Sequence, residues 1–158
     1  MITVSYGNKN SGNGNINKLE NIKGYAKLFA ENKADIVTAD GGFESDESVW
    51  ENPEMTVEVR TLQLLYNEVV AALSIQGDGG SFVLKIFGCS TKILLEILYL
   101  LSIHYDNVYI VKPVTSNILS HERYIVAKGF RGISNEELEG LYTITEKWLE
   151  IDPSGGIK

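Results

Sequence analysis

The stretch Asp35-Ile-Val-Thr-Ala-Asp-Gly-Gly-Phe43 decides how the rest of the chain is interpreted. Its apolar and β-branched residues from Ile36 to Ala39 predict a short buried strand that ends at an acid and two glycines. In an open α/β sheet, the carboxyl ends of the strands face the ligand crevice. Because glycines let the backbone turn and approach a ligand closely, Asp40 is the first candidate for a functional residue. An Asp-Gly pair is also a common plain turn, so this stretch alone leaves both interpretations open.

Strands and helices alternate along the rest of the chain. Runs of apolar and β-branched residues predict further strands, and apolar residues at helical spacing predict helices. The further strands are expected at residues 2–5, 81–87, 108–111 and 124–128, and the helices at residues 18–32, 56–75, 91–105 and 136–150. Asn17 and Asn135 are the expected N-caps of the first and last helix. A loop rich in Gly and Asn (residues 6–17) and a polar, acidic loop (residues 43–55) complete the pattern.

This order predicts an α/β fold with a mostly parallel sheet that helices cover on both faces. No helix separates the last two strands, which favours an antiparallel pair at one edge of the sheet. The chain has 158 residues, of which 44% are hydrophobic and 22% charged, so it is long enough for one sizeable core. We expect a single domain over residues 1–150 and a flexible tail over residues 151–158.

The composition excludes several classes of protein. The longest apolar stretch, residues 93–103, contains Glu96 and is too short to span a bilayer. The start of the chain lacks a basic segment followed by an apolar run, so no signal peptide is indicated. The single cysteine, Cys89, excludes an internal disulfide and a Cys-based zinc site and predicts an intracellular protein. His104 and His121 have no second His or Cys at metal-ligand spacing, so we expect no metal site.

Charge is distributed unevenly along the chain. The formal net charge of −7 argues mildly against wide, non-specific binding to nucleic acid. Between residues 81 and 128, however, five basic residues outnumber three acidic ones. An acidic total can therefore conceal a locally basic face.

Two charged residues do not fit a simple core. Lys85 lies in the middle of an apolar strand, so it is either close to the exposed strand end or held there by a nearby acid. Glu122 opens the last strand, where it is either an exposed surface residue or a functional one. Together with Asp40, these residues place three charges at three strand ends. Such a group can shift the pKa of the lysine and suits proton removal from an alcohol, whereas no Ser-His-Asp or Cys-His arrangement is evident.

Four motifs together resemble the FtsJ-like RNA ribose 2′-O-methyltransferases. They are Ala39-Asp-Gly-Gly-Phe, Gly79-Gly-Ser-Phe-Val-Leu-Lys-Ile-Phe, Lys112-Pro-Val-Thr-Ser and Ser120-His-Glu-Arg-Tyr-Ile-Val-Ala-Lys-Gly. They occur in the family's order and with similar spacing, over about residues 6–132. The chain is most similar to the cap-specific mRNA branch, in which an Asp-Gly-Gly-Phe and a Ser-x-Glu-Arg-Tyr also occur.

This resemblance implies a Rossmann-like sheet that binds S-adenosylmethionine and ends in an antiparallel hairpin, in agreement with the order of elements above. The family's active site is a Lys-Asp-Lys-Glu tetrad, whose last three members match Asp40, Lys85 and Glu122. Lys85 would then act as general base on the ribose 2′-hydroxyl, while Asp40 and Glu122 set its pKa and orientation.

The resemblance also implies binding residues. The cofactor would be held by Asn15, Asp40 and Gly41. Asn15 stands where the family usually has an Asp that contacts the adenine, and its amide can still form a hydrogen bond to the base. RNA would be bound by Lys112, Ser116 and Arg123. The two cationic members of this set are equally compatible with solvated surface charges.

The first Lys of the tetrad and the family's glycine-rich loop are expected upstream of Tyr6, where this sequence has neither. The resemblance therefore covers the carboxyl-terminal two-thirds of the domain, as in a fragment, a split gene product or a degenerate relative. The leading hypothesis is 2′-O-methylation of capped mRNA, and the alternatives are methylation of rRNA or tRNA and a non-catalytic binding module. A sheet without its first strands would expose an edge and apolar surface, so we also expect a partner chain or self-association.

Overall fold

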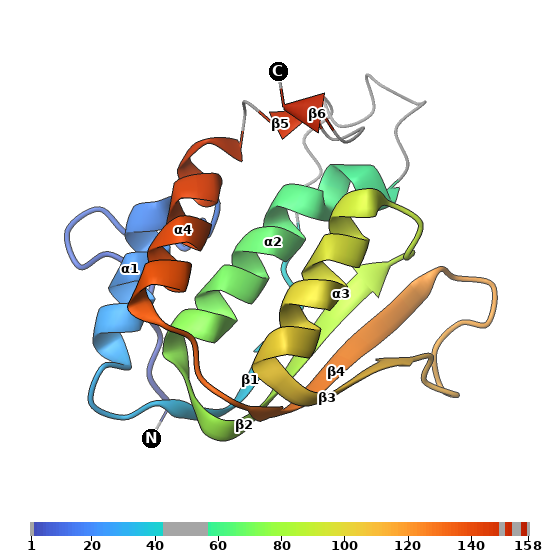
Figure 1. Cartoon of the computed structure of the whole chain (residues 1–158), viewed down its shortest axis with the longest axis horizontal. Helices are drawn as coiled ribbons and strands as arrows, with labels where there is room; N and C mark the ends of the chain where they lie inside the picture. Colours follow the sequence, from blue (N-terminus) through green and yellow to red (C-terminus); the bar gives the residue numbers. More distant parts are fainter. Residues whose placement is uncertain (1, 43–56, 149–150, 153–155, 158) are drawn as a thin grey trace.

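Helices and strands alternate from α1 to β3 along the chain, and β4, α4, β5 and β6 follow (Figure 1). The structure is a computed structural model that describes residues 2–42, 57–148, 151–152 and 156–157. The helices of these segments are α1 (Leu19–Leu28), α2 (Val57–Ile75), α3 (Lys92–His104) and α4 (Asn135–Glu146). The strands are β1 (Ala34–Ala39), β2 (Gln76–Phe87), β3 (Tyr105–Val111), β4 (Glu122–Phe130), β5 (Ile151–Asp152) and β6 (Gly156–Ile157). The expected loop at residues 43–55 lies outside the described residues.

The main sheet is mixed, with the strand order β1-β2-β4-β3. β1 pairs with β2 in parallel, and β4 pairs antiparallel with both β2 and β3. The predicted α/β class and the predicted antiparallel pair at one edge are therefore confirmed. The prediction of a mostly parallel sheet needs correction, because β4 lies between β2 and β3, and only one of the three pairings is parallel. β4 suits this inner place because Ile125 and Ala127 are fully buried, whereas most of β3 is exposed.

Helices lie on one face of this sheet (Figure 1). Alternate residues of β2, namely Phe82, Leu84 and Ile86, point to that face and are completely buried. They pack with apolar side chains of α2 and α3 into one hydrophobic core. This burial, at about 25 cal/mol for each Å² of apolar surface, supplies the main driving force for the fold.

The opposite face of the sheet is open among the described residues. Ile36 on β1 is 69% exposed and Tyr109 on β3 is 51% exposed, and Val83 and Lys85 on β2 are only partly buried. The expected cover on both faces is therefore wrong for the described part of the chain. The open face explains how Lys85 can lie inside an apolar strand, because its side chain points away from the helix-covered core.

The amino-terminal segment differs from the sequence-based expectation. Ile2–Ser5 was expected as a short strand, but it forms no regular secondary structure, and Ile2 is exposed. Asn17 does not cap α1: its side-chain oxygen instead accepts a hydrogen bond from Asn67 of α2 at 2.9 Å. α1 consequently begins one residue later, with Lys18 at the N-cap position and without a side-chain cap.

The carboxyl-terminal helix also begins with a different cap. Ser134, rather than the expected Asn135, caps α4 and forms a reciprocal capping box with Glu137. Beyond α4, β5 and β6 pair antiparallel within the segment for which we expected a flexible tail. None of the described helices is long and apolar enough to cross a membrane.

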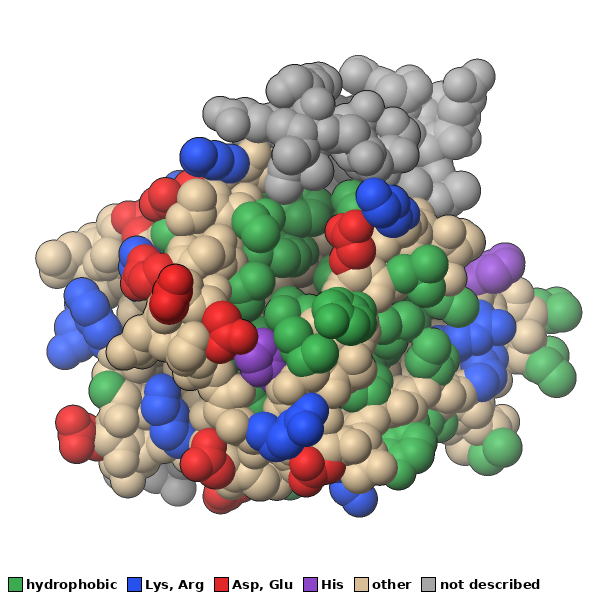
Figure 2. Space-filling model, viewed as in Figure 1, with side chains coloured by type: hydrophobic (Ala, Val, Ile, Leu, Met, Phe, Trp, Pro, Cys, Tyr) green, Lys and Arg blue, Asp and Glu red, His purple; other side chains and the backbone are tan. Residues whose placement is uncertain are grey.

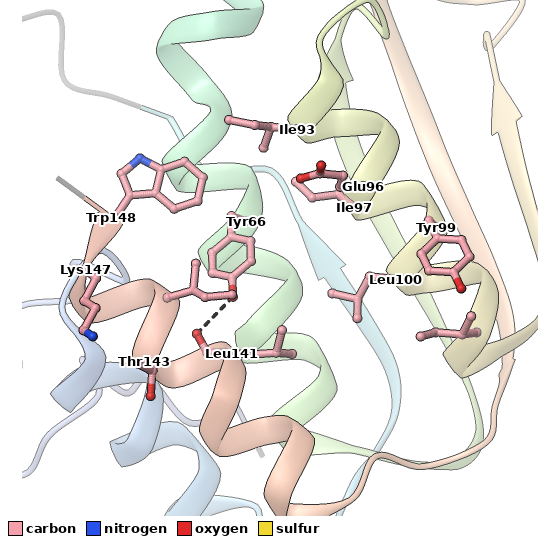
Figure 3. Close-up of a pocket in the computed structure, with 12 residues that line it drawn as sticks. Tyr66, Ile93, Glu96, Ile97, Tyr99, Leu100, Leu141, Thr143, Lys147 and Trp148 are labelled. Carbon is pink, nitrogen blue, oxygen red and sulfur yellow. Dashed lines mark hydrogen bonds between the residues drawn. The ribbon is translucent and has the colours of Figure 1, made fainter. Parts of the chain in front are cut away.

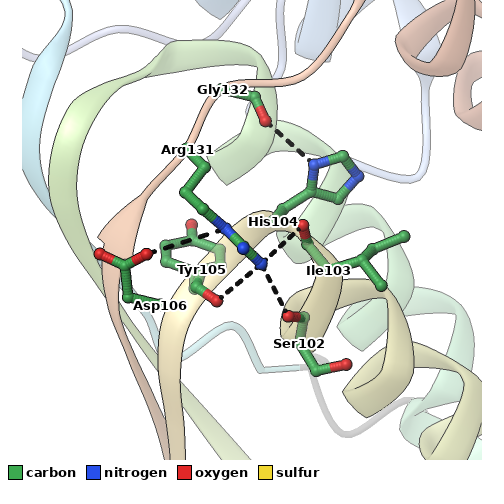
Figure 4. Close-up of polar contacts among 7 residues, drawn as sticks. All are labelled: Ser102, Ile103, His104, Tyr105, Asp106, Arg131 and Gly132. Carbon is green, nitrogen blue, oxygen red and sulfur yellow. Dashed lines mark hydrogen bonds and ion pairs between the residues drawn. The ribbon is translucent and has the colours of Figure 1, made fainter.

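Arg131 ties the carboxyl end of α3 to the end of β4 (Figure 4). Its guanidinium donates hydrogen bonds to the carbonyl oxygens of Ser102, Ile103 and Tyr105, at 3.0, 2.9 and 3.1 Å. A cation at this position satisfies the terminal carbonyls of a helix and interacts favourably with its dipole. The backbone N–H of Arg131 also donates to the carbonyl oxygen of His104. One side chain thus joins the helical layer to the sheet.

Replacing Arg131 with alanine tests this connection. We expect Arg131→Ala to lower the free energy of unfolding by about 1 to 3 kcal/mol, because a charged donor is removed from three carbonyl groups. Lys128→Ala, at an exposed position of β4, is the matched control and should change the value by less than about 0.5 kcal/mol. Urea denaturation measures both, and equal effects of the two substitutions would contradict a special role for Arg131.

Candidate active site

Asp40 and Lys85 form an ion pair on the open face of the sheet. Asp40 directly follows β1, and the parallel register sets Ala39 beside Leu84, so the acid emerges next to the lysine. The Lys85 ammonium lies 3.0 Å from the Asp40 carboxylate. The Lys85 side chain is 22% exposed and that of Asp40 is 67% exposed. The pair is therefore accessible from solvent, and one partner is held largely within the protein.

Glu122 and Tyr124 complete this group from β4. The antiparallel register sets Tyr124 beside Lys85 and Glu122 beside Phe87. The Tyr124 hydroxyl donates a hydrogen bond to the Glu122 carboxylate at 3.0 Å. The ammonium of Lys85 also lies 5.4 Å from the centre of the Phe87 ring, a distance at which a cation and an aromatic face attract each other. Three strands thus bring two acids, a lysine and two aromatic rings to one end of the sheet.

The acids keep Lys85 charged. The hydrogen bond to Asp40 is the main cause that raises the pKa of Lys85 above its ordinary value, and the charges of Asp40 and Glu122 add to it, while burial opposes the shift. The hydrogen bond to Glu122 likewise raises the pKa of the Tyr124 hydroxyl. In the free protein, Lys85 is therefore an ammonium at neutral pH, ready to donate hydrogen bonds to an oxygen atom. It must lose a proton before it can act as a base.

Helix α2 holds the loop that follows β2. The buried carboxylate of Glu58 accepts hydrogen bonds from the backbone N–H groups of Ser90 and Thr91, at 2.8 and 2.7 Å, and from the Ser90 hydroxyl at 2.7 Å. Burial alone would raise the pKa of Glu58, but these hydrogen bonds outweigh it and lower the pKa. Gly88 is confined to glycine here, because its φ is +124° and an added Cβ would lie 2.5 Å from Glu58.

Two consecutive residues of α2 hold the Gly- and Asn-rich loop and the turn after β1. Asn67 is completely buried, donates to the side-chain oxygen of Asn17, and accepts a hydrogen bond from the Thr145 hydroxyl of α4. Glu68 accepts a hydrogen bond from the backbone N–H of Gly41 at 2.6 Å. The Gly- and Asn-rich loop and the turn after β1 are therefore fastened to the same turn of one helix, which brings two predicted parts of the cofactor site together.

The Gly- and Asn-rich loop is folded around a buried amide. The Asn21 side chain accepts from the backbone N–H of Asn8 and donates to Asn13 and to the carbonyl oxygen of Asn15. Asn15 is exposed, and its side-chain oxygen accepts from the N–H of Asn17 at 2.9 Å. The side-chain amide nitrogen of Asn15 can therefore donate a hydrogen bond to a ligand.

The residues expected to bind RNA come from β4 and from the segment between β3 and β4. The Lys112 ammonium donates to the carbonyl oxygens of Asn117, Ser120 and Glu122 and to the Ser120 hydroxyl. Lys112 therefore shapes the loop between β3 and β4. Ser116 closes a turn in this loop through Pro113.

Arg123 lines an open pocket of about 640 Å³ at the end of β2. The other lining residues are Glu58, Phe87, Gly88, Cys89, Ser90 and His121. Arg123 is the positively charged residue of this lining, whereas the Glu58 carboxylate, whose oxygens accept the hydrogen bonds described above, carries a negative charge in it. The side chain of Arg123 also donates to the carbonyl oxygen of His121 at 3.1 Å.

An apolar pocket of about 520 Å³ lies elsewhere, on the outer side of the helices (Figure 3). It is lined by residues of α2, α3 and α4 and by Lys147 and Trp148, which follow α4. Hydrophobic side chains also gather on this face in the space-filling view (Figure 2), where Tyr99 and Ile103 are exposed. This pocket contains none of the residues that we predicted for the site. Within the described segments, no group of three potential metal ligands occurs.

Sequence reasoning missed four residues of this site. Tyr124 lies within the quoted Glu-Arg-Tyr motif, and its register with Lys85 is the signal that could have found it. Glu58, Asn67 and Glu68 occur in a helix in which polar residues usually face solvent, so their burial was not foreseeable from periodicity.

Comparison with known proteins extends these observations. Residues 3–130 match the model of a family described as FtsJ-like methyltransferase. The chain is 36% identical over 128 residues to cap-specific mRNA (nucleoside-2′-O-)-methyltransferase 1 of Trypanosoma brucei brucei, a match that covers 81% of this chain and 34% of that protein. It is 33% identical over 144 residues to the protein of the same name from Mus musculus, covering 89% of this chain and 17% of that protein. The chain thus spans about a third or less of these relatives.

Substitution of Glu58 tests the attachment of the loop after β2. Glu58→Ala should lower the free energy of unfolding by about 2 to 4 kcal/mol, because it leaves three donors without their acceptor. Since the folded pKa is lowered, this stabilisation is fully present above the ordinary pKa of 4.5 and is lost as the pH falls through the folded value. Unfolding of both proteins at pH 7 and below pH 4 measures it. Glu96→Ala, at an exposed position of α3, is the control and should have little effect at either pH. If the loss of unfolding free energy in Glu58→Ala is as large in acid as at pH 7, the role of the Glu58 charge is contradicted.

Proposed function

This chain belongs to the FtsJ-like methyltransferase family, and we propose that it methylates the 2′-hydroxyl of an RNA ribose, at the cap-proximal nucleotide of mRNA. The observation that carries the proposal is the ion pair between Asp40 and Lys85, with Glu122 beside it. These residues come from three separate motifs of the sequence and meet at one end of the sheet. The similarity to proteins named as cap-specific mRNA methyltransferases supports the choice of substrate.

Lys85 is the proposed catalytic base. Its amine takes the proton of the 2′-hydroxyl, and the carboxylate of Asp40 fixes the direction of that amine. Because Lys85 is charged in the free protein, the reaction requires its pKa to fall first. A positively charged ligand beside Asp40 would have this effect, since it competes for the carboxylate and repels the ammonium. Glu122, which accepts a hydrogen bond from the Tyr124 hydroxyl, limits this fall in the pKa of Lys85 through its negative charge.

S-adenosylmethionine is the proposed cofactor, which supplies an electrophilic methyl group and a positive charge when bound. Asp40, Gly41 and Asn15 would hold it. The groups present suit this role: Asp40 offers an exposed carboxylate, Asn15 offers an amide nitrogen, and the backbone at Gly42 has open space where a Cβ would be. Asp40 would therefore serve both the cofactor and Lys85.

RNA is the proposed partner of this site. The pocket beside Arg123 is open, and the Arg123 guanidinium can receive a phosphate of the RNA backbone there. Ser116 and the loop shaped by Lys112 would lie beside the bound RNA strand. Such a substrate places the reaction inside the cell, in the cytoplasm, the nucleus or a viral replication site. The partner chain or self-association that we expect to complete the sheet stays a prediction.

Two substitutions at the ion pair separate binding from chemistry. We expect wild-type protein to bind S-adenosylmethionine with micromolar affinity in calorimetry, and Asp40→Ala to abolish that binding. Lys85→Ala should bind the cofactor with little change but lower the rate of methyl transfer to capped RNA by about 100-fold or more, as expected for loss of a general base.

Matched RNAs distinguish the alternatives. Equal methylation of capped and uncapped RNA of the same sequence would contradict specificity for the cap and favour a tRNA or rRNA substrate. If the wild-type protein neither binds the cofactor nor transfers a methyl group, the proposal of a self-sufficient enzyme fails, and a non-catalytic binding module becomes the better interpretation.

A further inference from the structure

Glu68 is a buried acid that lies behind the proposed site. It belongs to α2, its residue is only 6% exposed, and its Oε1 atom accepts a hydrogen bond from the backbone N–H of Gly41 at 2.6 Å. That N–H belongs to the peptide group that joins Asp40 to Gly41. The contact therefore fixes the orientation of the peptide from which the Asp40 side chain extends.

Gly41 leaves room for this contact, whereas another residue would not. A Cβ added at Gly41 would lie 2.6 Å from the Glu68 carboxylate and 3.3 Å from Leu64, whereas one added at Gly42 would meet nothing within 4 Å. The Glu68 carboxylate thus restricts the first glycine of the Asp-Gly-Gly motif to a residue without a side chain, whereas it places no such restriction on the second. Two adjacent glycines with opposite surroundings provide a matched comparison.

The charge of Glu68 is set by its surroundings. Burial raises the pKa of Glu68 to about 7, the hydrogen bond from Gly41 lowers it, and the negative charge of Asp40 raises it. Among the described residues, Asp40 is the charged group outside α2 that acts electrostatically on Glu68. Asp40 is itself paired with Lys85. Because a carboxylate is a stronger acceptor than a neutral carboxyl group, Glu68 holds the Gly41 N–H more tightly at pH 8 than at pH 6.

We propose that Glu68 is a positioning residue that holds the turn formed by Asp40 and Gly41 and thereby sets the distance between Asp40 and Lys85. It touches neither substrate nor cofactor and acts through the peptide group of Gly41. The consequence for methyl transfer rests on the proposed function. The positioning itself does not, because it concerns an ion pair that is present in the free protein.

Nuclear magnetic resonance of the free protein tests the positioning directly. In the wild-type chain, the backbone amide signal of Gly41 should shift with a midpoint near pH 7. Glu68→Gln keeps an acceptor oxygen but cannot ionise, so this transition should disappear while the fold is retained. Glu68→Ala removes the acceptor and should also bring the pKa of Lys85 down toward its ordinary value of 10.5, as should Asp40→Asn, which removes the partner charge.

Binding and kinetics give the second readout. Glu68→Ala should weaken the affinity for S-adenosylmethionine by about 10-fold or more, which corresponds to the loss of one hydrogen bond to a charged acceptor. Glu68→Gln should restore most of the affinity and abolish its pH dependence between pH 6 and 8. A wild-type chain that shows no binding and no methyl transfer would refute the proposed function, whereas the Gly41 and Lys85 signals would still decide the positioning role.

The glycine pair provides a test that does not depend on the folding of the Glu68→Ala variant. Gly41→Ala should lower the free energy of unfolding clearly more than Gly42→Ala, because only the first alanine places a Cβ against the Glu68 carboxylate. The proposal is overturned if the Gly41 signal keeps its transition in Glu68→Gln. It is also overturned if the pKa of Lys85 is the same in Glu68→Ala as in the wild-type protein, or if Gly41→Ala and Gly42→Ala are equivalent.

Discussion

Buried polar side chains on one helix determine where the loops of this protein lie. Burying an acid or an amide costs several kcal/mol unless hydrogen bonds replace those lost from water. Glu58, Asn67 and Glu68 of α2 are each buried, and each finds its partners in a loop at the end of a strand or before a helix. The polar side chains of α2 therefore have their hydrogen-bond partners only when these loops are in place. The same requirement places two glycines, Gly41 and Gly88, against carboxylates at distances that an added Cβ could take only if the carboxylate moved.

The acid–lysine group depends on a second feature, the open face of the sheet. Had helices covered both faces, Lys85 would lie in an apolar layer, where burial lowers the pKa of a lysine. On the open face it remains 22% exposed and meets Asp40 and Glu122, which raise its pKa instead. The sheet thus provides a rigid support whose covered side is apolar and whose other side carries charge. Two sides of the same strand, Leu84 and Lys85, serve these opposite purposes.

Much of this arrangement was predictable from the sequence, because it depends on local patterns. The strand before Asp40, the amphipathic helix α2 and the strand that contains Lys85 follow from periodicity, and their alternation predicts that their polar ends meet. The inner place of β4 was not predictable, since periodicity reports which face of a strand is buried and not which strands are its neighbours. Asn17 shows a related limit: it has the chemistry of an N-cap, but a buried partner on another helix, Asn67, takes its oxygen. Lys112 resembles a free cation in the sequence, whereas four oxygen atoms of its own loop surround it in the structure.

The place of β4 has a consequence for how the molecule forms. Because β4 pairs with both β2 and β3, neither of those strands has its inner neighbour until residues 122–130 have been synthesised. Pairings between segments distant in sequence form slowly, because a long intervening loop must close first. During synthesis, β1 and β2, which place Asp40 and Lys85, are therefore complete before Glu122 and Tyr124 have been made. Pairing of this one strand with both of its neighbours covers an edge of each and brings Glu122 and Tyr124 to the end of the sheet where Asp40 and Lys85 lie.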